Sequence, residues 1–454
     1  MENKMVNKAN FSIEKTKVAF LTLGCKVNSY ETEAMQALLA GAGATIVEFH
    51  ELADIYVVNT CSVTNMADRK SRQMLHRAKK KNPEAIVVAA GCYAQTADEA
   101  AMKETGIDVV IGNNQKKQIV EILEQYMAGA ENKRLDIGKE TDYEELSLDT
   151  QIEHTRAYIK IQDGCNQFCS YCIIPYARGR IRSRNPQDVV EEVKRLAANG
   201  YQEVVLTGIH LSSYGRTSYE KMTEESGQPL LELIQQINAV DGIKRIRLGS
   251  LEPRIITEKF VKTLCECEKV CPHFHLSLQS GSDTVLVRMN RKYTTEEYAA
   301  SVEILKKYYE APAITTDIIV GFPQETEEEF LETMAFAKRI GFSKIHVFKY
   351  SRRKGTVADK MSGQVAEQVK TERSEQLMAL ETSLGEAYRE HFYDREELVL
   401  FEEGALVDGE VCQVGYNERY VRIAVKTEED LSNQIRTVKI MGKAKELETL
   451  IAEL

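Results

Sequence analysis

The chain lacks the features that mark membrane and secreted proteins. Its 454 residues contain no apolar run long enough to span a membrane, and the N-terminal stretch MENKMVNKANFSIEKTK has no signal-peptide core. We therefore expect a cytoplasmic protein, in which reducing conditions disfavour disulfides. Tryptophan is also absent, and this absence excludes no class of function.

A surplus of positive charge, common in nucleic-acid-binding proteins, is missing as well. The net charge of −10 argues against a broadly basic surface, although total charge says little about local patches. Basic runs do occur at residues 69–81, 177–184 and 349–354. The usual interpretation of such a run is a solvated helix face or loop. The second run begins five residues after Cys172, so it should lie close to whatever that cysteine does.

Six of the ten cysteines form two groups of three, and each group lacks a fourth thiolate. One group is a CxxxCxxC run in DGCNQFCSYC, and the other follows three apolar runs, VAFLTLGC, IYVVNTC and IVVAAGC. Three thiolates leave one iron of a [4Fe–4S] cluster free to bind another molecule, which indicates chemistry at iron. The candidate ligands are Cys165, Cys169 and Cys172 in the first group and Cys25, Cys61 and Cys92 in the second.

Zinc is the main alternative for the first group, but a structural zinc site needs four ligands and no fourth Cys or His has usable spacing. For the second group the alternative is three buried thiols, which are common in protein cores. We interpret the remaining cysteines as non-ligands, partly because an i, i+2 pair faces different sides of a helix. These are Cys265, Cys267, Cys271 and Cys412.

Alternation of apolar and amphipathic segments predicts an α/β protein. At the N-terminus it predicts a doubly wound parallel sheet, with ligands at the carboxyl ends of the strands. The middle shows six strands separated by five helical segments, typical of a partial (βα)6 barrel, and the tail predicts a small β-barrel. The tail holds nine Lys and Arg against sixteen Asp and Glu. The expected boundaries are 16–127 for the N-terminal domain, 128–150 for a linker, 151–381 for the barrel and 382–454 for the tail.

The motif DGCNQFCSYC resembles the radical S-adenosylmethionine superfamily. That resemblance implies that S-adenosylmethionine chelates the free iron and is split to a 5′-deoxyadenosyl radical. It also implies cofactor contacts within the motif and at LTGIH, HLSLQSGS and DIIVGFP, although each of these could be an ordinary βα turn. The implied residues are Tyr171, Thr207, Gly208, Gln279, Ser280 and Gly321.

Over nearly its whole length the chain resembles the methylthiotransferases, with blocks such as TLGCKVNSYETE, GCYAQ and DGCNQFCSYCIIPYARGRIRSR. The tail resembles the TRAM RNA-binding module. Gln324 is a departure, because the family usually has glycine there, and it leaves the shape of that turn open. The opening TLGCKVN is most similar to the branch that acts on N6-threonylcarbamoyladenosine in tRNA.

This resemblance implies addition of a methylthio group to C2 of the adenosine just 3′ of the anticodon. The second cluster would bind the sulfur, and a second S-adenosylmethionine would supply the methyl group. The implied partners are the tRNA anticodon stem-loop and a flavodoxin- or ferredoxin-like electron donor. We expect phosphate contacts from the basic run after the cluster motif, namely from Arg178, Arg180, Arg182 and Arg184.

Two alternatives remain open at this point. One keeps the chemistry but changes the substrate to isopentenyladenosine in tRNA or to a ribosomal protein. The other is a non-catalytic iron–sulfur protein that binds RNA or transfers electrons.

Overall fold

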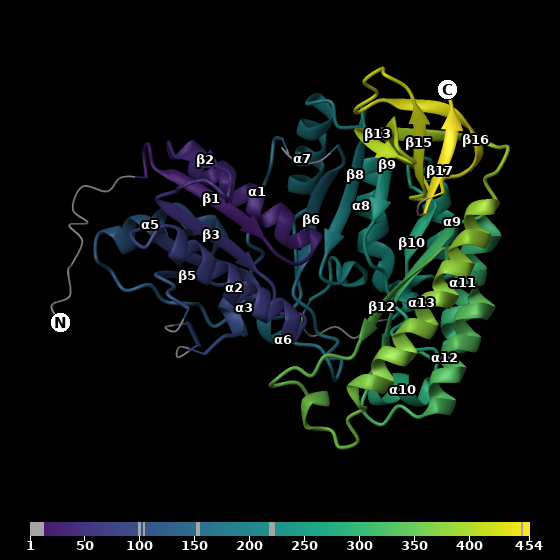
Figure 1. Cartoon of the computed structure of the whole chain (residues 1–454), viewed down its shortest axis with the longest axis horizontal. Helices are drawn as coiled ribbons and strands as arrows, with labels where there is room; N and C mark the ends of the chain where they lie inside the picture. The colour runs from purple at the N-terminus through teal and green to yellow at the C-terminus, as the bar shows by residue number, and fades with distance from the viewer. Residues whose placement is uncertain (1–12, 99–100, 103–104, 151–154, 218–222, 446–447) are drawn as a thin grey trace.

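The computed structural model describes residues 13–98, 101–102, 105–150, 155–217, 223–445 and 448–454. In these ranges a parallel sheet, an open barrel and a closed β-barrel follow one another along the chain (Figure 1). The predicted α/β class with its three β-structures is confirmed, while the expected boundary at residue 151 lies outside the described residues. Within the described ranges no helix combines the length and apolarity that crossing a membrane requires.

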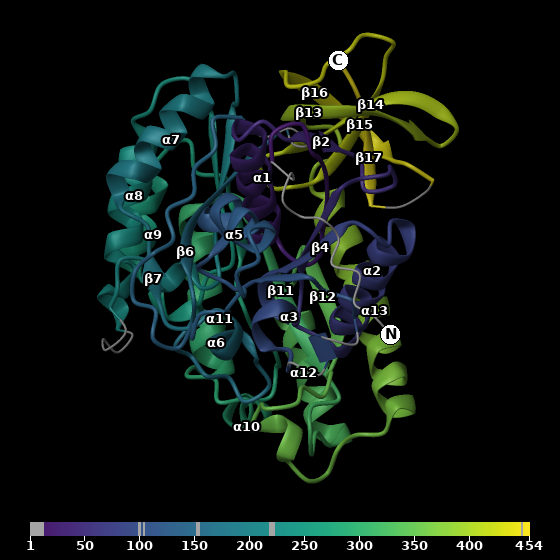
Figure 2. The same cartoon turned by 90° about the vertical axis from the view of Figure 1, so that its left-hand side faces the viewer.

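The N-terminal sheet has five parallel strands in the order β2-β1-β3-β4-β5. Helices α1 and α5 cover one face, and α2 and α3 cover the other, which explains why β3 is buried along its whole length (Figure 2). The elements are β1 (Lys17–Thr22), α1 (Lys26–Gly41), β2 (Thr45–Val47), β3 (Ile55–Thr60), α2 (Asn65–Lys81), β4 (Ile86–Ala90), α3 (Gly91–Thr96), β5 (Val109–Ile111), η2 (Lys116–Gln118) and α5 (Ile119–Met127).

The open barrel consists of two sheets, β7-β6-β8-β9 and β10-β11-β12, joined by isolated bridges. All six expected strands are present, and the short antiparallel β7 is an addition. Its elements are β6 (Ala157–Asp163), α6 (Ile174–Ala177), β7 (Arg182–Ser183), α7 (Pro186–Ala198), β8 (Glu203–Gly208), η3 (Leu211–Ser213), η4 (Glu224–Gly227), α8 (Gln228–Asn238), β9 (Arg245–Leu248), η5 (Pro253–Ile255), α9 (Glu258–Cys265), β10 (His273–His275), α10 (Asp283–Arg288), α11 (Thr295–Tyr308), β11 (Ala313–Val320), α12 (Glu327–Ile340), β12 (Lys344–Lys349), η6 (Ala358–Lys360) and α13 (Glu367–Glu390).

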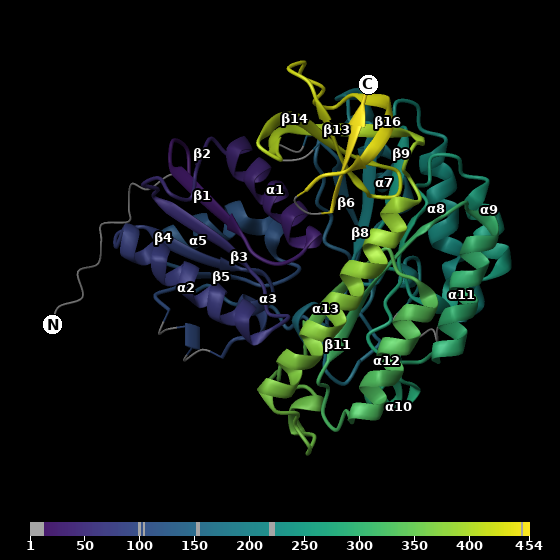
Figure 3. The ribbon, with the colours of Figure 1, turned by 45° about the vertical axis from the view of Figure 1, so that its right-hand side comes forward.

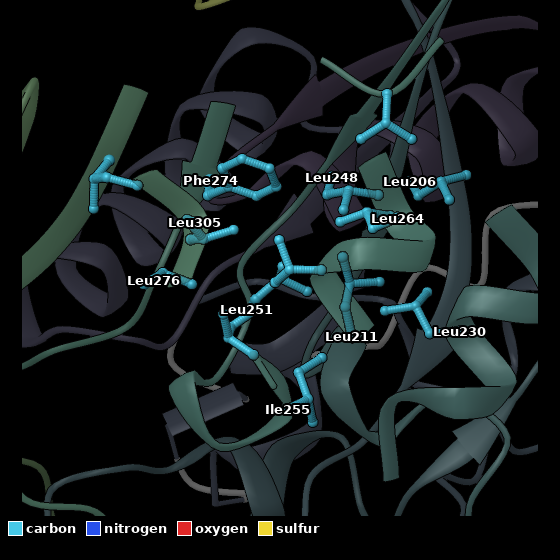
Figure 4. Packing of buried hydrophobic residues seen from close by; sticks show 14 of the residues in the cluster. Leu206, Leu211, Leu230, Leu248, Leu251, Ile255, Leu264, Phe274, Leu276 and Leu305 are labelled. Atoms are coloured by element: carbon cyan, nitrogen blue, oxygen red, sulfur yellow. The ribbon is translucent and has the colours of Figure 1, made fainter. Parts of the chain in front are cut away.

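A continuous apolar core joins the barrel strands to the helices outside them. Figure 4 shows Leu206 and Leu248 of the strands packing toward Leu230 and Leu264 of α8 and α9. Each of these side chains is almost fully buried. Burying a leucine side chain stabilises the fold by about 1.5–3 kcal/mol, so this core holds the strands, and with them the strand ends, in fixed positions.

Local sequence signals set where the outer helices begin and end. Thr294 and Glu297 form a capping box at the start of α11, and Thr326 and Glu329 form another at the start of α12. Gly341 ends α12 in the left-handed conformation with φ +71°.

Gln324 keeps the turn that a glycine would make. Its φ is +66°, in the left-handed region that glycine favours, at a cost of roughly 1–2 kcal/mol. The Gln324 amide N–H donates to Gly363 O at 2.7 Å, and its side chain reaches Ser362 O at 3.3 Å. These contacts hold Gln324 in the left-handed conformation that glycine favours.

The tail forms a closed barrel in the order β13-β14-β15-β17-β16, reached through the long helix α13 (Figure 3). Closure leaves no free strand edge. Four of the strands match the expectation, whereas β17 was not expected. They are β13 (Glu396–Val407), β14 (Glu410–Asn417), β15 (Arg422–Lys426), β16 (Ile435–Lys443) and β17 (Thr449–Glu453).

A buried ion network joins the N-terminal sheet to the open barrel. Glu31 of α1 lies 2.7 Å from the Lys160 ammonium on β6, 3.0 Å from Lys116 and 2.9 Å from the Arg178 guanidinium. Asp163 lies 2.7 Å from Lys160 and 3.1 Å from Arg178. All five side chains are buried. Burial alone would raise the pKa of Glu31, but Arg178, Lys116 and Lys160 lower it well below its ordinary value.

Replacing Arg178 by methionine should destabilise the protein strongly, because it strands buried carboxylates without their cation. The expected loss is about 3–5 kcal/mol, detected as a lower thermal midpoint of the iron-loaded protein. Arg195→Met is the control, since Arg195 pairs with Asp149 on the surface at 2.7 Å and should lose at most about 1 kcal/mol. Equal midpoints for the two variants would contradict a structural role for the network.

Candidate functional site

The three scattered cysteines lie at the carboxyl ends of neighbouring strands. Cys25 follows β1 and precedes α1, Cys61 directly follows β3, and Cys92 is the second residue of α3 after β4. Because β1, β3 and β4 are adjacent, the strand order brings the three thiols to one edge. Gly24 has φ +109°, and a Cβ there would lie 3.0 Å from Cys61 Sγ, so glycine permits the close approach.

These thiols lie near enough to act on one another electrostatically. Burial, together with the charges of Cys92 and Cys25, raises the pKa of Cys61 to about 11, against a hydrogen bond from the Val63 amide. Burial also raises the pKa of Cys25, while the Arg178 charge lowers it. A thiolate in such surroundings needs a nearby cation, which a bound metal supplies.

The CxxxCxxC loop follows β6 and is fastened by the segment after α10. The Ser170 amide donates to Met289 O at 3.0 Å, and Asn290 Nδ2 donates to Phe168 O at 2.9 Å. Arg291 donates to Cys169 Sγ at 3.2 Å. Sequence reasoning missed Arg291, although its position in the RMNRKYT block was a usable signal. Donors aimed at a ligand sulfur are typical of iron–sulfur sites.

The two cysteine groups approach each other across the interface of sheet and barrel. After burial and Cys169, the charge of Cys92 is among the causes that raise the pKa of Cys172. Asn113 Nδ2 lies 3.7 Å from Cys92 Sγ and donates to Ala177 O at 2.7 Å, just beyond the CxxxCxxC loop. Asn113 therefore touches both sides, and sequence reasoning missed it as well.

The spacing of the sulfurs suits a cluster better than a single ion. Among the described residues only His275, Asp317 and His346 bring three ligand atoms within 4.8 Å of one another. Each cysteine group is thus wider than one metal ion held about 2.3 Å from every sulfur would require. All ten cysteines are free thiols. The residues present fit two [4Fe–4S] clusters, each with one iron lacking a cysteine.

Cys25, Cys61 and Cys92 are called the N-terminal group. A cavity of about 690 Å³ opens beside this group and is lined by all three β-structures. Cys25 and Lys26 come from the N-terminal sheet, His275 from the open barrel, and Tyr416 and Tyr420 from the closed barrel. Its volume is in the usual range of ligand sites. The closed barrel is therefore part of the cavity wall.

A second cavity of about 260 Å³ lies at the CxxxCxxC loop and is lined by Tyr171, Cys172, Gln279 and Asp317. Tyr171 and Gln279 were expected to contact S-adenosylmethionine, and the cavity brings both beside a cluster cysteine. Asp317 lines both cavities.

The other expected S-adenosylmethionine contacts are dispersed. Thr207 and Gly208 line the larger cavity. Ser280 is buried with its hydroxyl 3.3 Å from Thr333 Oγ1, and Gly321 packs against the side chain of Lys370 in α13. The contacts of these four with the cofactor stay predictions.

Three of the four expected phosphate-binding arginines are buried and paired with carboxylates, which corrects the expectation for them. Arg178 lies in the ion network, Arg182 lies 3.7 Å from Asp163, and Arg184 pairs with Glu192 and Glu145. Buried guanidinium groups cannot reach a phosphate without breaking these pairs. Arg180 is partly exposed, with its guanidinium 4.6 Å from the centre of the Phe168 ring. Its contact with RNA stays a prediction.

Comparison with known proteins agrees with this geometry. Residues 159–337 match the model of the Radical SAM superfamily, and residues 17–112 match Uncharacterized protein family UPF0004. The threonylcarbamoyladenosine tRNA methylthiotransferase MtaB of Bacillus subtilis is 44% identical over 428 residues, which is 93% of each chain. The chain belongs to the radical SAM methylthiotransferase family. Membership confirms the predicted enzyme class and the predicted cofactors, two [4Fe–4S] clusters and S-adenosylmethionine.

Other similar proteins span more than one branch of this family. MtaB of Aquifex aeolicus is 39% identical over 90% of this chain and all of that protein. A tRNA-2-methylthio-N(6)-dimethylallyladenosine synthase of Syntrophomonas wolfei is 39% identical over 80% of this chain and 81% of that protein. Among solved structures, the radical S-adenosylmethionine methyltransferase TsrM of Kitasatospora setae shares the fold, with a TM-score of 0.55, 15% identity and coverage of 74% of this chain and 73% of that one.

Replacing Cys25, Cys61 and Cys92 together by alanine should remove about half of the bound iron and sulfide, because thiolate ligation retains each cluster. The anaerobically reconstituted variant is compared with the wild type by iron and sulfide analysis. The matched control replaces Cys265, Cys267 and Cys271, where Cys265 Sγ donates to Tyr308 O at 3.4 Å and Cys267 Sγ to Thr263 O at 3.8 Å. That control should keep all its iron, and a loss there would contradict the ligand assignment.

Proposed function

We propose that this enzyme adds a methylthio group to C2 of N6-threonylcarbamoyladenosine next to the tRNA anticodon. The observation that carries the proposal is that the two cysteine groups stand at two cavities that share Asp317 in their linings. The two relatives named as threonylcarbamoyladenosine tRNA methylthiotransferases support the choice of nucleoside.

The two cysteine groups would each hold one cluster, at different cavities. Cys165, Cys169 and Cys172 would hold one cluster at the smaller cavity, and the N-terminal group would hold the other at the larger cavity. When bound, the clusters and S-adenosylmethionine supply a radical that activates C2, sulfur for insertion and a methyl group. The reducing electron would come from a flavodoxin- or ferredoxin-like partner.

Asp317, which lines both cavities, and its neighbours would orient the substrate. His275 lies 3.5 Å from Asp317 and 3.0 Å from Thr315 Oγ1, so its ring is fixed from two sides. A fixed polar wall can hold a flipped-out base by hydrogen bonds while the surrounding protein excludes water.

The main alternative substrate is dimethylallyladenosine, because a synthase for that nucleoside is also 39% identical. The two substrates differ in charge, since the threonylcarbamoyl group carries a carboxylate and the dimethylallyl group is a hydrocarbon. The charge of the side chains that line the cavity therefore affects which of the two nucleosides it binds.

Nucleoside analysis of tRNA by mass spectrometry tests the proposal. A strain without this gene should lose 2-methylthio-N6-threonylcarbamoyladenosine and accumulate the unthiolated nucleoside, and the gene should restore the product. A gene copy carrying alanine at Cys25, Cys61 and Cys92 should fail to restore it. Loss of the methylthiolated dimethylallyladenosine instead would show that the enzyme belongs to the branch that acts on dimethylallyladenosine.

RNA would meet the chain around the mouth of the larger cavity. Tyr416 and Tyr420 stack with ring centres 4.7 Å apart, and the Arg156 guanidinium lies 4.9 and 4.7 Å from them. Such partly exposed rings can stack on bases of a single-stranded loop. We also propose that Arg180, which is partly exposed, contacts a phosphate of the RNA.

Replacing Arg180 by alanine should weaken binding of the anticodon stem-loop and lower the slope of log K against log salt by about 0.7–0.9, the value for one phosphate contact. Fluorescence anisotropy at several salt concentrations measures both quantities. Arg195→Ala, on the outer surface of α7, should leave the slope unchanged. An unchanged slope for Arg180→Ala would reject the contact.

A further inference from the structure

The larger cavity is lined by a lysine, Lys26, whose ammonium group forms no ion pair with a carboxylate of the described residues. Three cations surround the Tyr420 ring: Arg156 at 4.7 Å, Arg247 at 4.8 Å and the Lys26 ammonium at 6.0 Å from its centre. Arg156 is paired with Glu402 at 2.6 Å, and Arg247 is paired with Glu203 at 2.7 Å. Among the described residues Lys26 has no such ion pair, and its ammonium also lies 5.7 Å from the centre of the Tyr158 ring.

Other cations of the cavity are already engaged or stand elsewhere. Lys344 pairs with Glu381 at 3.1 Å, Arg419 donates to two backbone carbonyls, and Arg422 donates to Thr449 Oγ1 at 2.9 Å. Arg389 has no carboxylate partner in the described ranges, but it lies on α13 beside the closed barrel. Lys26 is thus the unmatched cation that adjoins the N-terminal cysteine group.

The chemistry of the substrate places an anion at this point. On adenine, C2, N1 and N6 lie along one edge of the ring, so a wall that serves C2 also faces a substituent on N6. Cys25 and Lys26 are consecutive in the chain and both line the cavity. A nucleoside that presents C2 to a cluster at Cys25 therefore brings its N6 substituent toward Lys26.

We propose that Lys26 binds the carboxylate of the N6-threonylcarbamoyl group and thereby selects that substrate over an uncharged one. This inference rests on the proposed function and names the residue that recognises the substituent. A hydrogen bond between two charged groups in a partly enclosed site is stronger than a neutral one, so the carboxylate should matter substantially for binding. An apolar dimethylallyl group would leave the ammonium unpaired, which disfavours that substrate.

Binding of three anticodon stem-loops to the reconstituted enzyme tests the proposal. The stem-loops carry N6-threonylcarbamoyladenosine, its carboxylate methyl ester, or plain adenosine at the same position. The wild type should bind the acid at least about tenfold more tightly than the ester. Lys26→Gln should reduce that ratio to near one, whereas Lys26→Arg should retain part of it. Iron content shows that each variant keeps both clusters.

Lys344→Gln is the matched control, because it removes a lysine of the same cavity that is already paired. It should keep the ratio of the wild type. Equal binding of acid and ester by the wild type would overturn the proposal without reference to any variant. A Lys26→Gln enzyme that keeps the ratio, or that weakens binding of all three stem-loops equally, would also overturn it.

A separate measurement distinguishes this inference from the proposed function. If the wild type methylthiolates the threonylcarbamoyl stem-loop but Lys26 does not affect the ratio, only the role of Lys26 is wrong. If the wild type instead converts a dimethylallyladenosine stem-loop and not the threonylcarbamoyl one, the proposed function fails and the inference fails with it.

Discussion

The buried contact between Glu31 and Arg178 determines how the two cysteine groups face each other. Glu31 follows Cys25 by six residues, and Arg178 follows Cys172 by six residues, so the contact joins one position near each group. An unpaired charge in the interior costs several kcal/mol. Movement of the N-terminal sheet along β6 would therefore leave Glu31 or Arg178 buried without its partner. This energetic cost holds the two cysteine groups in their relative positions.

The same network prepares the site for negative charge. Lys116, Lys160 and Arg178 all contact Glu31, and Lys160 and Arg178 also contact Asp163. Arg178 also lowers the pKa of Cys25 against the effect of burial. Thiolates and the clusters that they hold bring negative charge into the protein interior. The neighbouring cations outnumber the carboxylates of the network, and they offset the free-energy cost of desolvating that negative charge. One group of side chains thus serves assembly and electrostatics together.

Sequence alone identified what depends on local pattern. Cysteines at the ends of apolar runs were predicted to meet, and adjacency of β1, β3 and β4 brings them together. The arginine run misled because its exposure depends on distant partners: Arg178 pairs with Glu31 and Arg184 with Glu192, and no local pattern shows this. Lys160 inside the apolar run AYIKIQDG was a signal of buried charge that could have been used.

Docking of the closed barrel explains how an acidic module can form part of the wall of the larger cavity. Arg245 and Arg247 of β9 donate mainly to backbone carbonyls of that barrel, at 2.7 Å to Leu398 O and 2.8 Å to Glu418 O. Backbone acceptors are present whatever the side chains are, so this part of the docking does not depend on the charge of the barrel, and Arg156 adds an ion pair with Glu402 of β13. Its net acidity can then reside on outward surfaces, where solvent screens it within about 10 Å. At the cavity, Tyr416 presents its ring face to Arg156 and Tyr420 presents its ring face to Arg247, and the attraction between cation and ring keeps these positive groups beside the cavity wall.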